Sequence, residues 1–345
     1  MEPAVGAWCT GSEVCFRLHD RDRRLTGVRL RTDVVDGAPE FAYVAAGRIW
    51  ELRLPRPPVW RMEYRLELTR RDGGVQTVCD PDNPLRAGGG YGDSSELRCP
   101  GYREPDWVQL PAAPGGWRDV YLPLPAVKGE TVARIWSPAV PADQVVVAHD
   151  GPDYHRYGQL GRYCAAMIGA GRVPPHHLVL LPPGERFEWY SASPAYARAL
   201  TGDVLPKLAA ELGTDRPVVG VGASLGGLAM LHAQRRHPDR FAGLFLQSGS
   251  FFQPRFDRQE SGFPRWLRIV RFTGRVLRDT GGPAVPAALT CGAAEENLAN
   301  NRDMAAALGR HGYPVSFAEV PDAHTWVGWR DALDPHLTSL LQHVF

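Results

Sequence analysis

The sequence lacks the features that mark several specialised classes of protein. It contains no run of about 18 uncharged apolar residues, so we expect no transmembrane helix. Its first residues show no basic segment followed by an apolar core, so we also expect no secretory signal. The formal net charge is only +1, which gives no general reason to expect nucleic acid or an acidic membrane surface as a partner.

Cysteine is sparse, and its spacing suggests no special site. The six cysteines are scattered along the chain, without a C-x-x-C pair or a zinc-like pattern. We therefore expect reduced thiols in a cytoplasmic protein, with no bound metal and no cofactor.

What the sequence does contain is the balance of a globular protein, with 44% hydrophobic and 22% charged residues. Its 345 residues suffice for one large domain or two ordinary ones. The first part is rich in short segments of β-branched and aromatic residues separated by turn signals, which predicts a small all-β, immunoglobulin-like sandwich. The predicted strands are Glu13–Leu18, Gly27–Thr32, Arg48–Leu54, Met62–Thr69 and Val75–Cys79.

Two stretches rich in proline and glycine follow, Asp80–Asp93 and Pro100–Pro114. Such composition is typical of a connector on the surface rather than of secondary structure. We therefore expect an N-terminal domain over residues 1–112 and a catalytic domain over residues 113–345.

From there strands and helices alternate, which predicts a mostly parallel sheet with both faces covered. Eight strands with a nucleophile turn after the fifth are the arrangement of an α/β-hydrolase. The predicted strands are Asp119–Leu124, Thr131–Trp136, Val145–His149, Leu178–Leu181, Pro217–Gly222, Gly243–Gln247, Ala287–Cys291 and Val315–Val320. The predicted helices are Tyr157–Ala170, Pro194–Leu212, Leu225–Arg236, Asn297–His311 and a last one from Thr325 to about His343.

The nucleophile turn is the most informative motif. After an apolar run the chain continues Gly222-Ala-Ser224-Leu-Gly226 and then enters a stretch of small residues. This G-x-S-x-G pattern puts a serine on a strained turn, and the glycines leave room where strand and helix crowd together. The pattern alone occurs by chance in many proteins. Here both flanks fit, so we predict that Ser224 is a catalytic nucleophile.

A base and an acid are needed beside it, and in this fold they follow late strands in the order Ser, acid, His. His324 lies between the last strand and the last helix, so we predict that it is the general base. Glu295 and Glu296 follow the seventh strand, and one of them should orient the imidazole. We favour Glu295, because Glu296 could instead begin the next helix, where a carboxylate offsets the helix dipole. Asp322 is expected to shape a turn.

Acyl transfer also requires two donors for the developing oxyanion. One should be the backbone N–H of Leu225, the residue after the nucleophile. The other should come from the loop after the third strand. Pro152 has no N–H, so Gly151, Asp153 or Tyr154 must supply it.

Together these segments resemble the enterochelin-esterase-like branch of an esterase family of α/β-hydrolases. The resemblance covers nearly the whole chain and rests on an ordered set of motifs. These are Asp80-Pro-Asp-Asn-Pro, His149-Asp-Gly-Pro-Asp-Tyr, Arg186-Phe-Glu-Trp-Tyr, Gly-Ala-Ser224-Leu-Gly-Gly, Cys291-Gly-x-x-Glu-Glu-Asn-Leu and His324-Thr-Trp-x-x-Trp-Arg-Asp. One departure is Glu295, where relatives often have Asp.

The resemblance implies cytoplasmic hydrolysis of a catechol siderophore trilactone, bound alone or as its ferric complex, to release iron. Arg186, Tyr154 and Trp326 are the candidate substrate contacts. Arg186 could equally form an ion pair with Glu185 or Glu188, and Trp326 could pack the last helix against the sheet. Seven arginines between Gln253 and Asp279 could attract an anionic substrate, or form the solvated face of an amphipathic helix.

Two other functions stay open from the sequence. The first is a serine esterase for another lactone, a depsipeptide or an aryl ester, since the motif does not specify the substrate. The second is a non-catalytic binding protein on a hydrolase fold, which the intact Ser, Glu and His argue against. No residue pattern indicates an oligomeric state.

Overall fold

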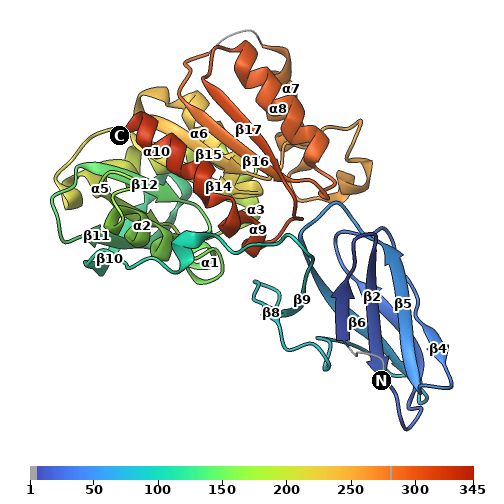
Figure 1. Ribbon diagram of the computed structural model, residues 1–345. Coiled ribbons are helices and arrows are strands. Elements are labelled where there is room, and N and C mark those ends of the chain that lie inside the picture. The colour runs from blue at the N-terminus through green and yellow to red at the C-terminus, as the bar shows by residue number, and fades with distance from the viewer. Residues whose placement is uncertain (1–5, 280–281) are drawn as a thin grey trace. The chain divides into compact units, whose positions relative to one another are not determined.

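The computed structural model describes residues 6–279 and 282–345, and the chain divides into two compact units (Figure 1). The first unit contains the chain up to Arg103, together with Gly292–Glu295 and Val320–Gly328. The second contains Glu104–Cys291, Glu296–Glu319 and Trp329–Phe345. The first break in this division lies between Arg103 and Glu104, and two short segments from the second half of the sequence belong to the first unit.

The first unit is built on antiparallel strands, as its sequence predicted. Two sheets pack through a common core that includes Phe16 and Tyr64, whose rings meet edge to face at 5.0 Å. We call this part the N-terminal sandwich. One sheet has the order β1 (Gly6–Cys9), β2 (Glu13–His19), β5 (Ile49–Pro55), β4 (Ala42–Val44). The other has the order β3 (Leu25–Arg31), β6 (Arg61–Arg70), β9 (Ser94–Arg98), β8 (Arg86–Ala87), with β7 (Val75–Val78) also paired to β6.

The segment after Cys79 is not the surface connector that its composition suggested. The Asp80 side chain is buried and accepts a hydrogen bond from the Tyr64 hydroxyl at 2.6 Å. Asn83 is also buried, and its side-chain amide donates to the backbone oxygen of Glu96 at 2.8 Å. Polar side chains in this proline-rich stretch therefore bond into the sandwich, because a buried irregular backbone needs such partners.

The expectation that all cysteines are reduced thiols is wrong for two of them. Cys9 at the end of β1 and Cys99 just after β9 form a disulfide that joins residues 90 positions apart in the sequence. The other four cysteines, Cys15, Cys79, Cys164 and Cys291, are thiols.

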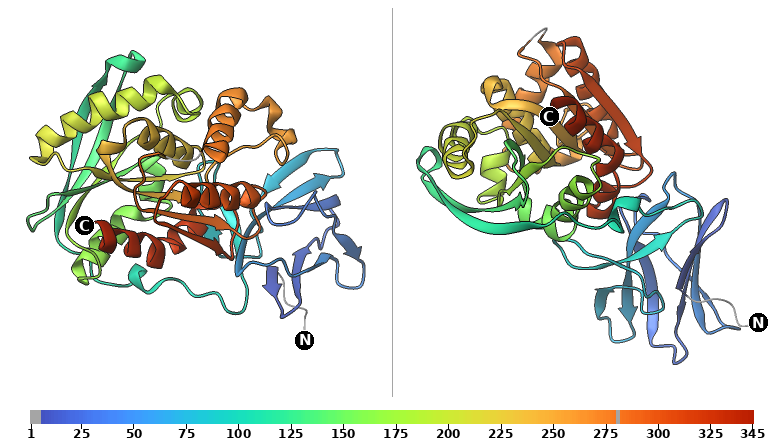
Figure 2. Two further views of the ribbon diagram at one scale, coloured as in Figure 1. Left: turned by 90° about the horizontal axis from the view of Figure 1, so that it is seen from above. Right: turned by 60° about the vertical axis from the view of Figure 1, so that its left-hand side comes forward.

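The second unit contains a large mixed sheet with helices on both faces, as Figure 2 shows. Strand β12 pairs in parallel with β13 and β14. Strand β15 pairs in parallel with β14 on one side and with β16 on the other. The hairpin of β10 and β11 is antiparallel and pairs with β13. Across the sheet the order is β10 (Gly115–Leu124), β11 (Gly129–Pro138), β13 (His176–Leu180), β12 (Gln144–Ala148), β14 (Val218–Ala223), β15 (Phe241–Gln247), β16 (Ala287–Gly292) and β17 (Val315–Val320).

The helices follow the predicted alternation with local differences. The predicted last helix is interrupted at Asp334, whose backbone is extended (φ −110°, ψ 126°) because the following Pro335 disfavours a helical residue before it. The α-helices of the unit are α1 (Gly151–Arg156), α2 (Leu160–Gly169), α3 (Arg186–Tyr190), α4 (Pro194–Arg198), α5 (Leu205–Leu212), α6 (Leu225–Arg236), α7 (Trp266–Arg278), α8 (Leu298–Arg310) and α10 (Thr338–Val344). Helix α9 (Trp326–Asp331) begins within the segment Val320–Gly328 of the first unit.

The α/β architecture preceded by an all-β region is thus confirmed. Across the described parts of the chain, no helix combines the length and apolar character needed to cross a membrane.

The disulfide gives a direct test by mass. We expect protein denatured without reductant and treated with iodoacetamide to gain four alkyl groups, since Cys9 and Cys99 are paired. Prior reduction should raise the number to six. Intact-mass measurement distinguishes the two, and six groups without reductant would contradict the pairing.

Candidate active site

Ser224 occupies a sharp turn between the end of β14 and the start of α6. Its backbone has φ 53° and ψ −124°, a conformation that a residue with a side chain rarely adopts. A Cβ added to Gly222 would lie 2.4 Å from the backbone of Gly226. With a larger residue at position 222, strand β14 and helix α6 could not approach each other this closely. The glycine requirement of the motif therefore has a steric cause. The turn leaves the Ser224 side chain half-buried at the carboxyl end of the strand.

A second serine lies beside it, and sequence reasoning missed this residue. The Ser250 hydroxyl is 3.1 Å from the Ser224 hydroxyl, and the Ser250 N–H donates to the Ser224 carbonyl at 3.1 Å. Ser250 follows β15, the neighbour of β14 in the sheet. The signal available in the sequence was only its position three residues after a predicted strand, which does not distinguish it from other loop residues.

His324 is bonded to Glu295. Its Nδ1 lies 2.7 Å from Glu295 Oε2, and the Glu295 side chain is 1% exposed. The other carboxylate oxygen accepts the N–H of Gly292 at 2.7 Å, which fixes the orientation of the carboxylate. Glu296 is exposed and accepts from Gln259 at 3.3 Å. Of the two adjacent glutamates, the structure therefore brings Glu295 to the imidazole.

The oxyanion donors expected from the loop after β12 are engaged elsewhere. The Gly151 N–H donates to the Leu181 carbonyl at 2.9 Å. The N–H groups of Asp153 and Tyr154 donate to the Asp150 carbonyl at 3.1 and 3.0 Å, respectively. The amides of Asp153 and Tyr154 thus close the first turn of α1, and that of Gly151 bonds to the residue after β13. The prediction that Gly151, Asp153 or Tyr154 supplies the second donor is therefore corrected. Leu225 is the first residue of α6, where an N–H has no acceptor within the helix.

His149 cannot replace His324 as a base. Its ring is fully buried, with Nδ1 3.0 Å from the Gly226 carbonyl and Nε2 2.9 Å from the Tyr196 hydroxyl. Burial lowers the pKa of His149 to about 4, so the ring stays neutral near pH 7. Its role is to tie the end of β12 to the first turn of α6.

The predicted substrate contacts Arg186 and Tyr154 bond to other parts of the protein. Arg186 forms a two-pronged ion pair with Asp150, from Nε to Oδ1 at 2.8 Å and from Nη2 to Oδ2 at 2.9 Å. This partner, Asp150, is not one that the sequence suggested. Tyr154 is fully buried and its hydroxyl donates to Gln247 Oε1 at 2.7 Å, so the predicted substrate contact of Tyr154 is corrected. Trp326 is half-buried in the segment that carries His324.

The arginine-rich stretch before β16 is partly neutralised by its own surroundings. Arg265 and Arg268 both pair with Glu188, at 2.5 and 2.7 Å, and Arg255 pairs with Asp303. Within α7, Ile269 is buried and the arginines lie on the outer side, as in an amphipathic helix. The structure favours the packing interpretation for this segment over an anion-binding one.

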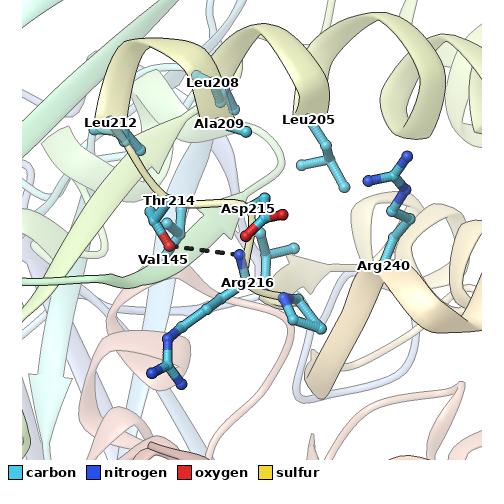
Figure 3. A pocket seen from close by; sticks show the side chains of 11 residues that line it. Val145, Leu205, Leu208, Ala209, Leu212, Thr214, Asp215, Arg216 and Arg240 are labelled. Atoms are coloured by element: carbon cyan, nitrogen blue, oxygen red, sulfur yellow. Dashed lines mark hydrogen bonds between the residues drawn. The ribbon is translucent and has the colours of Figure 1, made fainter.

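A small cavity lies at the other end of β14 (Figure 3). It has a volume of about 30 Å³, room for one or two water molecules, and is lined by Val145, Leu208 and Arg240 among others. Val145 and Val218, which also lines it, stand near the beginnings of β12 and β14, whereas Ser224 follows the end of β14. This cavity is therefore not the candidate site. Among the described residues, no three His, Cys, Asp or Glu side chains are grouped so as to hold a metal ion.

The comparisons with known proteins agree with this geometry. Residues 135–340 match the family model described as "Putative esterase". A search of curated protein sequences found no match. Among solved structures, the chain is similar to the enterobactin esterase of Shigella flexneri, determined in the presence of enterobactin. The TM-score is 0.79 at 19% identity, over 97% of this chain and 95% of that one.

Two further structures show how far the likeness extends. The ferric enterobactin esterase of Salmonella typhimurium has a TM-score of 0.80 at 19% identity, over 96% of this chain and 94% of that one. A ferulic acid esterase has a TM-score of 0.56 at 16% identity, over 67% of this chain and 98% of that one. At these identities the likeness establishes the fold alone. The family match spans more than half of the sequence, and the chain therefore belongs to this esterase family.

Proposed function

We propose that this protein is a serine esterase that cleaves the ester bonds of a catechol siderophore trilactone of the enterobactin type. The observation that carries the catalytic part is the pairing of His324 with the buried Glu295, together with a serine on the strained turn at Ser224. These are the three residue types of a catalytic triad, in the chain order that this fold uses.

In the proposed reaction, His324 Nε2 takes the proton of the Ser224 hydroxyl as its oxygen attacks the ester carbonyl carbon. Glu295 holds the Nδ1–H tautomer and stabilises the imidazolium that forms. The carbonyl oxygen becomes an oxyanion, toward which the Leu225 N–H at the start of α6 is expected to donate. Ser250, within hydrogen-bond distance of the nucleophile, helps to orient the Ser224 hydroxyl.

The intermediate then collapses and the carbon–oxygen bond to the leaving alcohol breaks. The imidazolium gives its proton to the departing alkoxide, which leaves an acyl group on Ser224. Water then enters: its oxygen attacks the acyl carbon while His324 accepts its proton. The bond to Ser224 breaks, the imidazolium returns the proton to the serine oxygen, and the carboxylic acid departs. No step needs a metal or an organic cofactor, since the imidazole moves each proton.

The proposed substrate rests on the N-terminal sandwich. The enterobactin esterases correspond to this chain over 96–97% of its length, whereas the ferulic acid esterase corresponds over only 67%. A serine esterase for another lactone, a depsipeptide or an aryl ester is the alternative, because the triad itself does not select the acyl group.

The substrate is tested by mass spectrometry of the products. Incubation with a cyclic catechol trilactone, with and without ferric iron, should yield first the linear trimer, heavier by one water, and then its dimer and monomer fragments. Intact trilactone beside rapid hydrolysis of a simple aryl ester would favour the alternative esterase. Intact trilactone and intact aryl ester would favour a binding protein.

The nucleophile is tested by replacing Ser224. Because Ser224→Ala removes the attacking oxygen, we expect kcat toward an aryl ester to fall by about 10⁶-fold or to the detection limit. Ser261→Ala is the matched control, since Ser261 is an exposed serine outside the site. Esterase activity retained by Ser224→Ala would exclude this nucleophile.

The acid is tested with the two adjacent glutamates. Glu295→Gln keeps the shape but cannot hold the imidazole tautomer, so we expect kcat to fall by about 10³- to 10⁴-fold. Glu296→Gln, one residue further along the chain, should leave kcat within about twofold, as exposed substitutions away from a site usually have small effects. Steady-state kinetics with one aryl ester measures both variants. The opposite ranking would mean that Glu296 is the acid.

A further inference from the structure

The segment that carries His324 is bonded to strand β6 of the N-terminal sandwich. Residues Val320–Gly328 belong to the same compact unit as the sandwich. The N–H of Trp60, just before β6, donates to the Pro321 carbonyl at 2.8 Å. This main-chain bond places the first residue of β6, Arg61, against the segment.

Arg61 is fully buried, and its guanidinium is surrounded by acceptors. On the sandwich itself, Nε donates to Glu96 at 2.9 Å and Nη2 donates to Glu63 at 2.7 Å. Nη1 donates to Asp322 Oδ2 at 3.0 Å and to the Thr325 hydroxyl at 3.0 Å. The guanidinium therefore joins strands β6 and β9 of the sandwich to the segment around His324. Its several N–H donors point in different directions within one plane, so it can bond to all of these acceptors at once.

Asp322 also accepts hydrogen bonds from the residues on both sides of His324. Its Oδ1 accepts the N–H of Ala323 at 2.7 Å and the hydroxyl of Thr325 at 3.1 Å. The Thr325 hydroxyl oxygen in turn accepts the N–H of Gly328 at 3.0 Å. The backbone immediately before and after His324 is thus held by one buried carboxylate.

The same segment is bonded to the one that carries Glu295. The Ala293 N–H donates to the Val320 carbonyl at 2.7 Å, and the Ala294 N–H donates to the Asp322 carbonyl at 3.3 Å. Burial raises the pKa of the Asp322 carboxyl, while the positive charge of Arg61 opposes that rise and favours the ionised form. Arg61 pairs with all three carboxylates here. Without it Asp322 and Glu63 would lose this compensating charge, whereas Glu96 would keep its ion pair with Arg98.

We propose that Arg61 is a positioning residue for the catalytic base: through Asp322 and Thr325 the N-terminal sandwich sets the place of the His324 imidazole. The inference rests on the proposed function, since it requires His324 to act as the base. It gives the sandwich a part in catalysis that does not depend on touching the substrate.

The test is a double-mutant cycle measured with an activated aryl ester. Arg61→Lys keeps the charge but cannot reach all four acceptors, so we expect kcat to fall by about 10- to 100-fold with KM within about twofold, as for a misplaced catalytic group. In the His324→Ala background the same substitution should change the residual kcat by less than about twofold, because the two residues act as a unit. Arg17→Lys is the matched control, since Arg17 is a largely buried arginine of the sandwich that pairs with Glu51 at 2.5 Å.

The outcomes separate the inference from the function on which it rests. Unchanged kcat in Arg61→Lys, or an equal loss in both backgrounds, would overturn the positioning role. Unchanged kcat in His324→Ala would instead overturn the proposed function. If Arg61→Lys does not fold, as judged by its thermal unfolding transition, Asp322→Asn enters the same cycle. That variant leaves Arg61 paired with Glu63 and Glu96. We expect it to lower kcat by the same factor when His324 is present and to have little effect in the His324→Ala background.

Discussion

The Arg61 guanidinium is fully buried, and its charge is balanced by three carboxylates from three parts of the sequence. Glu63 and Glu96 come from the N-terminal sandwich, and Asp322 lies 261 positions away along the chain. Breaking a buried pair of this kind by removing one partner typically costs about 3–5 kcal/mol, because the remaining charge is left without compensation. The first unit therefore depends on the segment around His324, and that segment depends on the sandwich. The discontinuous division of the chain follows from this interaction.

The nucleophile is positioned by a different kind of constraint. At Ser224 the placement is steric: Gly222 and Gly226 let strand and helix approach closely, and the serine backbone between them has a positive φ of 53°. At His324 the placement is electrostatic, through Asp322 and Arg61. The two halves of the proposed triad are thus built by local packing in one case and by long-range charge in the other.

This difference explains what could be predicted from the sequence. Each predicted strand of the second half overlaps a strand of the structure, and α6 has its predicted bounds, because apolar runs and small-residue helices are local signals. Ser224, His324 and Glu295 could be selected by their places after particular strands. Glu295 could not be separated firmly from Glu296, because the deciding contact is with a histidine 29 positions away.

The features that were missed all depend on partners far away in the sequence. Nothing near Arg61 indicates Asp322, and nothing near Cys9 indicates Cys99. The proline-rich stretch at Asp80 looked like a connector, because composition does not reveal that Tyr64 and Ser95 bond to it. The predicted oxyanion donors were wrong for a related reason: the Gly151 amide donates to the carbonyl of Leu181, 30 positions away, and the Asp153 amide donates within the first turn of α1.

The most direct test of a serine activated by His324 is to locate a covalent adduct. Native protein is treated with a fluorophosphonate, digested, and examined by tandem mass spectrometry. The account predicts one adduct, on Ser224, and its loss in the His324→Ala variant. An adduct on another residue, or undiminished labelling of Ser224 in the absence of His324, would contradict it.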